Sequence, residues 1–293
     1  MKVKWLREYN TEFNIEIVYA GENCLSYRKD VKEEIEKYGC ENLKVVILSE
    51  NLAKKVIGLR EKKFLEDNAV GNEEYKNYID SVKNFYEKSP DCYTHDEESG
   101  LLLLNIDHPE WRRGLEEGLF HHLTFQEGWL KTYEEVFSKF WNAILVSLNE
   151  FELLSTIHSS VSDLLSFAMG VEKGNKNFCE SSVKTYLENT IRRNSEDELL
   201  KFREYPEASY NFLIDVTGHS TLPENYGKER EKTKEEIILP KREKLFQYLS
   251  PVVRDYEKEV DEIFWNLKIP PEKSDLNERM KELISFYLEG LLT

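Results

Sequence analysis

Residues 101–129 read LLLLNIDHPEWRRGLEEGLFHHLTFQEGW, and this stretch decides the expected fold. Its first six residues form an apolar run of strand length. Asp107 can then cap a helix, because Glu110 follows three residues later as in a capping box and Pro109 lies in the first turn. We therefore predict a strand over 101–106 that leads directly into a helix.

Two earlier apolar runs, FNIEIVY at 13–19 and LKVVIL at 43–48, have the composition of strands. Residues 27–38 between them have helical periodicity. A strand, a helix and a strand within about 35 residues have the size of a βαβ unit, which predicts two parallel neighbouring strands. The segment CYTHDEE before Gly100 predicts an antiparallel partner for 101–106.

Further helices are predicted over 51–65, over 72–87 and through most of the remaining chain, where Asp275 marks the N-terminus of the last one. The expected fold class is α+β, with a small N-terminal βαβ-containing sheet followed by a mainly helical body. The α+β region covers residues 1–106 and the helical body 107–293. We expect one compact unit, because no linker rich in Pro, Gly and Ser separates them.

Composition excludes several classes of function. The chain has 293 residues and a formal net charge of −16, which repels phosphate backbones, so we expect no nucleic-acid partner. It contains no apolar run of about 18 residues, so we expect no membrane-spanning helix or other membrane association. The N-terminus lacks the apolar core of a signal peptide, which predicts a cytoplasmic location. An unidentified protein partner is compatible with this composition.

The four cysteines, at 24, 40, 92 and 179, lie far apart and form no CxxC pair. In a cytoplasmic chain of this size we expect thiols and no disulfide. The turn around Cys24 resembles the active-site turn of glutaredoxin-like proteins, although Tyr27 stands where the second cysteine of that motif would be. An ordinary cysteine in a turn is the alternative that we prefer.

Acidic residues and histidines concentrate in the central helices. The candidates for a metal site are His121, His122, His158 and Asp163, and those for an acid or base are Glu117 and Glu127. Glu117 and His121 are four positions apart and share a helix face. Zinc takes three or four such ligands, and no other cofactor is indicated. The alternative is that His122 and His158 are core residues with separate partners, while His121 faces solvent.

A strand followed by a helix with His and Glu, and then by a long helix with acids, resembles the core layout of zincin-type metallopeptidases. The resemblance covers the chain between Leu101 and Gly170. In that family the helix carries HExxH, with both histidines on zinc and the glutamate as general base. Here the helix reads EEGLFHHLTFQE and has no HExxH. The resemblance therefore implies either a degenerate, inactive relative or a relative with rearranged ligands.

Two functional hypotheses follow. The first is a non-catalytic protein-interaction protein, placed ahead because the HExxH motif is missing. Its aromatic helices would form both a core and a partner surface. The second is a zinc-dependent hydrolase, with its site between the helix of Glu117 and Glu127 and the helix of His158 and Asp163. There Glu117 or Glu127 would orient or deprotonate a zinc-bound water.

Overall fold

The computed structural model describes residues 5–21, 23–68, 92–96, 99–144, 158, 161–163, 165–170, 172–175, 177–178 and 272–292. The chain divides into two compact units, Met1–Glu127 and Gly128–Thr293. The helices predicted over 72–87 and between 180 and 269 lie outside the described residues, as does Cys179.

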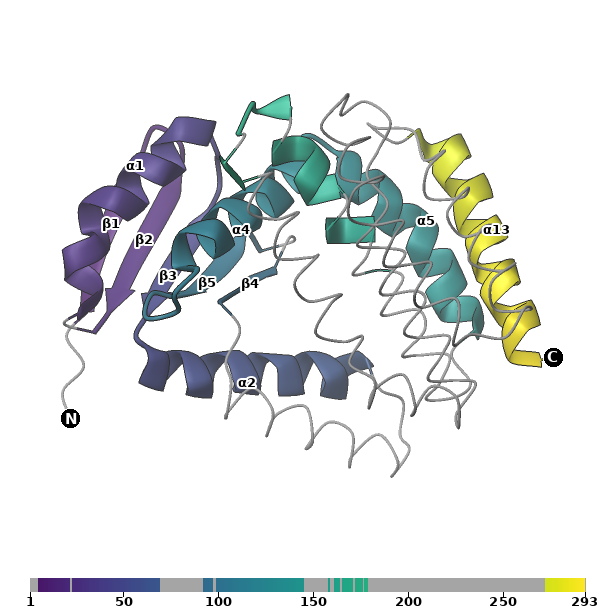
Figure 1. Ribbon diagram of the computed structural model, residues 1–293, viewed down its shortest axis with the longest axis horizontal. Helices are drawn as coiled ribbons and strands as arrows, with labels where there is room; N and C mark the ends of the chain where they lie inside the picture. Colours follow the sequence, from purple (N-terminus) through teal and green to yellow (C-terminus); the bar gives the residue numbers. More distant parts are fainter. Residues whose placement is uncertain are drawn as a thin grey trace, which may run out of the picture. The chain divides into compact units, whose positions relative to one another are not determined.

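The first unit is built on a five-stranded mixed sheet (Figure 1). Its strands are β1 (Trp5–Asn10), β2 (Ile15–Ala20), β3 (Lys44–Leu48), β4 (Tyr93–Asp96) and β5 (Leu101–Asn105), in the order β1-β2-β3-β5-β4. The three central strands are parallel, and both edge strands run antiparallel to their neighbours. Together with the helices that follow, this sheet confirms the α+β class.

The predicted βαβ unit and hairpin are both present. After a short 3-10 turn (Asn23–Tyr27), α1 (Arg28–Tyr38) connects β2 to β3, which pair in parallel. Gly39 follows α1 at φ 68°, a left-handed conformation that suits glycine and ends the helix. In the hairpin of β4 and β5, His95 lies opposite Leu102.

One predicted strand boundary needs correction, and one strand was not predicted at all. The strand expected from residue 13 begins only at Ile15, because Asn14 has φ 54° and belongs to the turn between β1 and β2. Strand β1 itself was missed, because its sequence WLREYN lacks a run of buried apolar residues. Its side chains alternate between exposed and half-buried, as an edge strand allows.

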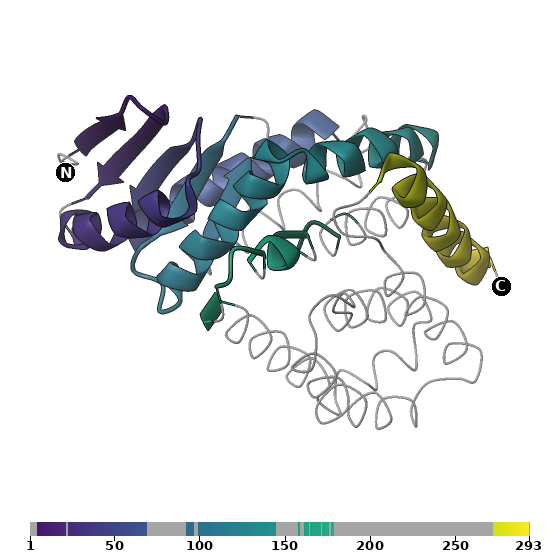
Figure 2. The ribbon, with the colours of Figure 1, turned by 90° about the horizontal axis from the view of Figure 1, so that it is seen from above.

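Helices cover both faces of this sheet. Helices α1 and α4 (Trp111–Gln126) lie side by side on one face, and α2 (Glu50–Asn68) packs on the other (Figures 1 and 2). Ala53 and Ile57 of α2 join Leu103 of β5 in a buried apolar cluster. On the opposite face, a Cβ at Gly118 would lie 2.4 Å from Leu102 Cδ1, so glycine lets α4 approach β5 closely.

The capping box predicted at Asp107 and Glu110 is wrong. Glu110 is the N-cap of α4 and makes no side-chain capping hydrogen bond. The Asp107 carboxylate instead accepts a hydrogen bond of 2.9 Å from the N–H of Glu50, at the start of α2. Asp107, in the turn after β5, therefore binds the first turn of α2 and not that of α4. A local sequence pattern does not reveal this contact.

The second unit contains α5 (Trp129–Ile144) and α13 (Lys273–Leu292), which pack against each other. Lys273 forms an ion pair with Glu135 across this contact. Gly128, at φ 86°, separates α5 from α4, at the position where the sequence predicted an interruption. None of the helices in the described part of the chain has the length and apolar character needed to cross a membrane.

Candidate metal site

Glu117 and His121 lie one helical turn apart on α4, because residues spaced by four share a helix face. Both residues are buried, and each is only 5% exposed. A carboxylate oxygen of Glu117 and a ring nitrogen of His121 lie within 4.8 Å of each other. The first unit thus holds one oxygen donor and one nitrogen donor, of the kinds that bind divalent metal ions, out of contact with bulk water.

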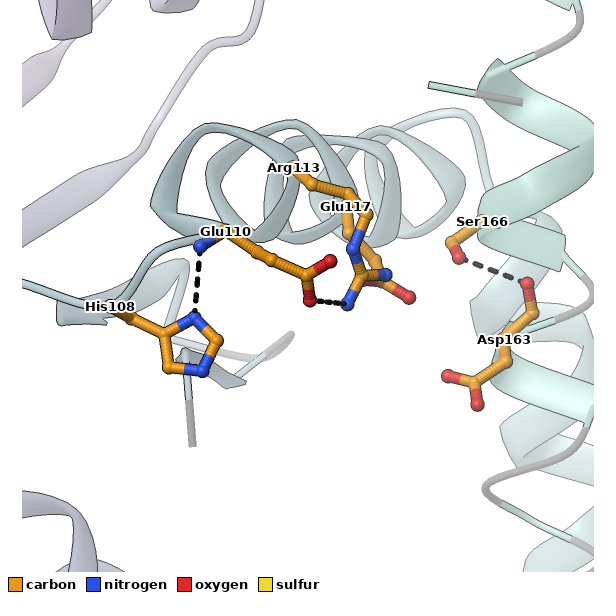
Figure 3. Close-up of polar contacts among 6 residues, drawn as sticks. All are labelled: His108, Glu110, Arg113, Glu117, Asp163 and Ser166. Atoms are coloured by element: carbon orange, nitrogen blue, oxygen red, sulfur yellow. Dashed lines mark hydrogen bonds and ion pairs between the residues drawn. The ribbon is translucent and has the colours of Figure 1, made fainter. Parts of the chain in front are cut away.

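Arg113 is the cation that accompanies Glu117. Its Nη1 donates to Glu117 Oε2 at 2.8 Å, one turn along α4, and its Nη2 lies 3.4 Å from Glu110 Oε2 (Figure 3). Both Arg113 and Glu117 side chains are mostly buried. A charged side chain is costly to bury alone, so the ion pair is what allows Glu117 to remain inside the unit.

His95, on β4, brings a second imidazole to His121. The two rings are stacked, with centroids 6.5 Å apart and planes inclined by 28°. The His95 ring also meets the ring of His122 edge to face, with centroids 5.5 Å apart. His95 was not among the predicted site residues. The predicted hairpin could have identified His95. It places His95 opposite Leu102, on the sheet face that α4 covers.

His122 takes part in a different contact. Its Nε2 lies 2.7 Å from the main-chain oxygen of Glu41. A carbonyl oxygen only accepts hydrogen bonds, so Nε2 must carry the proton, and the neutral ring then has its lone pair on Nδ1. This contact matches the alternative in which His122 is a core histidine with its own partner. His121, which the same alternative placed in solvent, is instead only 5% exposed.

Glu127 lies apart from Glu117. It is exposed and directly follows the last residue of α4, where its N–H bonds to Leu123 O at 2.8 Å. Ten residues of helix separate the two glutamates, which is about 15 Å along the axis. The two predicted acid or base candidates therefore do not share a site, since Glu117 lies in the middle of α4 and Glu127 directly after its last residue.

His158 and Asp163 belong to the second unit. His158 Nε2 lies 2.6 Å from Glu134 Oε1, and the His158 ring packs against the rings of Tyr133 and Phe137 of α5. Asp163 is half-buried, and its main-chain carbonyl accepts a 3.0 Å hydrogen bond from the Ser166 hydroxyl (Figure 3). Within its own unit, His158 thus has an acidic partner that the sequence did not identify.

The thiols do not support redox chemistry at the Cys24 turn. Cys24 is buried, and its Sγ donates to the carbonyl oxygen of Ala20 at 3.4 Å. Burial, together with the nearby Asp107 carboxylate, raises the pKa of the Cys24 thiol to about 11. The thiol is therefore protonated at neutral pH, the opposite of an activated thiolate. Cys24, Cys40 and Cys92 form no disulfide within the described residues, as predicted for these three.

Comparison with protein-family models, with curated proteins and with solved structures found no match.

Proposed function

We propose that the Met1–Glu127 unit binds a divalent metal ion, with Glu117 and His121 as ligands. Zinc is the ion that we expect. The observation that supports this most directly is the buried donor pair on α4, with its oxygen and nitrogen within 4.8 Å. Zinc bonds to carboxylate oxygen and imidazole nitrogen at about 2.0–2.2 Å, so two donors on one ion lie at most about 4.4 Å apart, a separation comparable with that of this pair.

The surroundings of the pair fit this chemistry in two respects. Burial keeps water away from both donors, and electrostatic attraction to a cation is stronger where the effective dielectric constant is low. The His95 ring against His121 adds an imidazole, the most common kind of zinc ligand. Asp163 stays a ligand predicted from the sequence alone. A bound zinc ion would supply a water of lowered pKa, which is the nucleophile that the zinc-dependent hydrolase hypothesis requires.

Arg113 argues against the site, because its guanidinium already neutralises Glu117 at 2.8 Å. If the ion pair is the whole role of Glu117, removing the positive charge only destabilises the fold. If Glu117 is also a ligand, Arg113 competes with the metal for the carboxylate. Replacement of Arg113 by methionine therefore separates the two roles: we propose that Arg113→Met binds zinc more tightly than the native protein.

Zinc affinity is measured by competition with a chromophoric chelator, on protein stripped of metal and checked for native circular dichroism. We expect about one zinc per chain for the native protein. Loss of an outer-sphere partner costs a metal site about 10–100-fold in affinity, so Glu117→Gln and His121→Ala should cost at least that. Glu127→Gln is the matched control, because it makes the same chemical change at an exposed position beside the same helix.

The proposal fails if the native protein binds no zinc, or if folded Glu117→Gln and His121→Ala bind zinc as well as Glu127→Gln does. His95→Ala and Asp163→Asn, titrated in the same way, identify the residue that completes the site. Whether the ion serves hydrolysis is a further step. It is tested by zinc-dependent cleavage of a mixed library of fluorogenic peptides, with Glu117→Gln as the inactive reference.

A protein-interaction role is the second candidate, and one observation favours it. Trp5 and Tyr9 on strand β1 are each 63% exposed, which is unusual for large aromatic side chains. Aromatic residues are enriched at protein interfaces because they bury a large area with few rotatable bonds. A cytoplasmic location stays a prediction from the N-terminal sequence.

A further inference from the structure

Strand β1 pairs with β2 on one side, and within the described part of the chain no strand pairs with its other side. An edge strand of this kind presents a row of main-chain N–H and C=O groups to any other strand. Many edge strands are protected by charges or by a bulge. Here two of the three exposed side chains, Trp5 and Tyr9, are aromatic and the third is Arg7, which leaves an edge that a further strand can join.

The aromatic side chains share one face of the sheet. Trp5, Arg7 and Tyr9 lie opposite Ala20, Val18 and Glu16 of β2, and directly opposed residues point to the same face. Arg7 therefore has an aromatic residue two positions before it and another two positions after it. This arrangement is self-complementary, because a two-fold axis through Arg7 exchanges the positions of Trp5 and Tyr9.

We propose that a second copy of this chain pairs with β1, antiparallel and about a two-fold axis at Arg7, so that Trp5 of each copy meets Tyr9 of the other. This proposal does not depend on the metal site. Aromatic pairs directly across an antiparallel strand pair are among the favourable cross-strand contacts. The two-fold axis creates two such contacts, so Trp5 and Tyr9 of both copies are covered. The two sheets then form one continuous sheet.

The charges around Arg7 permit this register. Two arginines face each other at the axis, but each Arg7 Nε lies 2.8 Å from Glu16 Oε1 of its own chain. Lys44 Nζ lies 3.3 Å from the other oxygen of Glu16. A register centred on Glu8 would instead oppose two carboxylates and leave Trp5 facing the turn at residues 11–14. Of these two registers, only the one at Arg7 brings Trp5 opposite Tyr9.

The overall charge gives the association a recognisable salt dependence. Two copies that each carry a net charge of −16 repel each other at a distance, whereas the paired strands themselves are locally neutral or positive. Salt screens the long-range repulsion, since the Debye length falls from about 30 Å at 0.01 M to about 8 Å at 0.15 M. Association should therefore strengthen as salt is added over this range.

Sedimentation velocity of the full chain, over a hundredfold range of concentration, tests the proposal. We expect a monomer–dimer equilibrium for the native protein, and an increase of at least tenfold in the dissociation constant for Trp5→Ser and for Tyr9→Ser. Leu59→Ser is the matched control, because Leu59 is 58% exposed on α2 and takes no part in the proposed contact. It should dimerise like the native protein.

Cysteine cross-linking tests the register. Residues directly opposed across an antiparallel pair have Cβ atoms about 4.5–5.5 Å apart, close to disulfide reach. Under mild oxidation Arg7→Cys should form a covalent dimer, whereas Leu6→Cys and the native protein should not. A native protein that stays monomeric, a Trp5→Ser variant that dimerises as well as Leu59→Ser, or cross-linking through Leu6→Cys in preference to Arg7→Cys would each overturn the proposal.

Discussion

His122 of α4 donates a hydrogen bond from Nε2 to the main-chain oxygen of Glu41, 2.7 Å away and 81 positions earlier in the chain. Glu41 lies between α1 and β3, so the contact fastens the helix that carries the candidate site to the loop that enters the central sheet. The same loop is held a second time, because the N–H of Glu41 donates to Gln126 Oε1 at 3.1 Å.

Replacing His122 by alanine should destabilise the first unit by about 2–4 kcal/mol, because it removes a buried, packed ring and the hydrogen bond that this ring donates to the Glu41 carbonyl. Amide hydrogen exchange of α4 peptides measures this free energy for the first unit separately from the second. Glu127→Ala, at the exposed end of the same helix, should change it by less than about 0.5 kcal/mol. Equal effects of the two replacements would show that the hydrogen bond is unimportant.

Gly118→Ala should destabilise the protein although alanine favours helices by about 1 kcal/mol over glycine. The new methyl group would lie 2.4 Å from Leu102 Cδ1, so either the buried Leu102 side chain or α4 must shift. Such overpacking costs about 1–3 kcal/mol. In a double-mutant cycle, Leu102→Ala should relieve part of the cost of Gly118→Ala. Strict additivity of the two changes would contradict the proposed collision.

Tyr38→Phe should cost about 1–3 kcal/mol, because the Tyr38 hydroxyl donates to the buried Glu116 carboxylate at 3.2 Å and charged acceptors make the stronger hydrogen bonds. Tyr9→Phe is the control. It removes a hydroxyl that donates to Glu16 at an exposed position, and it should cost less than about 0.5 kcal/mol. Urea midpoints of the two variants, compared at pH 7, give the answer. A larger loss for Tyr9→Phe would contradict the expectation.

Stability should fall as pH rises above about 9. Burial raises the pKa of Cys24 from 9.0 to about 11 and that of Cys92 to about 12. In this window the unfolded chain has already lost the thiol protons that the folded chain still holds, so increasing pH favours unfolding. Urea midpoints measured from pH 8 to 11 should decline, and Cys24→Ala should decline less steeply. A flat profile would show that these thiols titrate alike in both states.

The strands of the sheet centre were predictable from sequence because each is buried on both faces and therefore reads as an apolar run, as in LKVVIL and LLLLN. Strand β1 was not, since an edge strand with one exposed face needs no such run. The parallel pairing of β2 and β3 followed from the length of their connection. That β5 lies beside β3 was not predictable, because the pattern of one strand does not name its neighbour.

At the candidate site, the spacing of Glu117 and His121 was enough to place both on one helix face. Their burial was not predictable, because charged and polar side chains suggest solvent exposure. For Glu117 it is made possible by the ion pair with Arg113, one turn away. The Asp107 carboxylate shows the limit most clearly: a local capping pattern pointed to α4, whereas the chain turn directs it to Glu50 of α2. Contacts between segments distant in sequence decide such cases.

The pairing of β3 with β5 sets a time order for folding. Leu101 lies opposite Lys44 in this parallel pair but follows it by 57 positions. β3 can therefore pair with β5 only after the long segment between them has been synthesised and its ends have come together. Hairpin β1–β2 needs only a four-residue turn and can form while later residues are still being synthesised. During that interval the nascent chain exposes the unpaired side of β3. Chaperone dependence of newly made protein should therefore end when synthesis has passed β5, well before the second unit is complete.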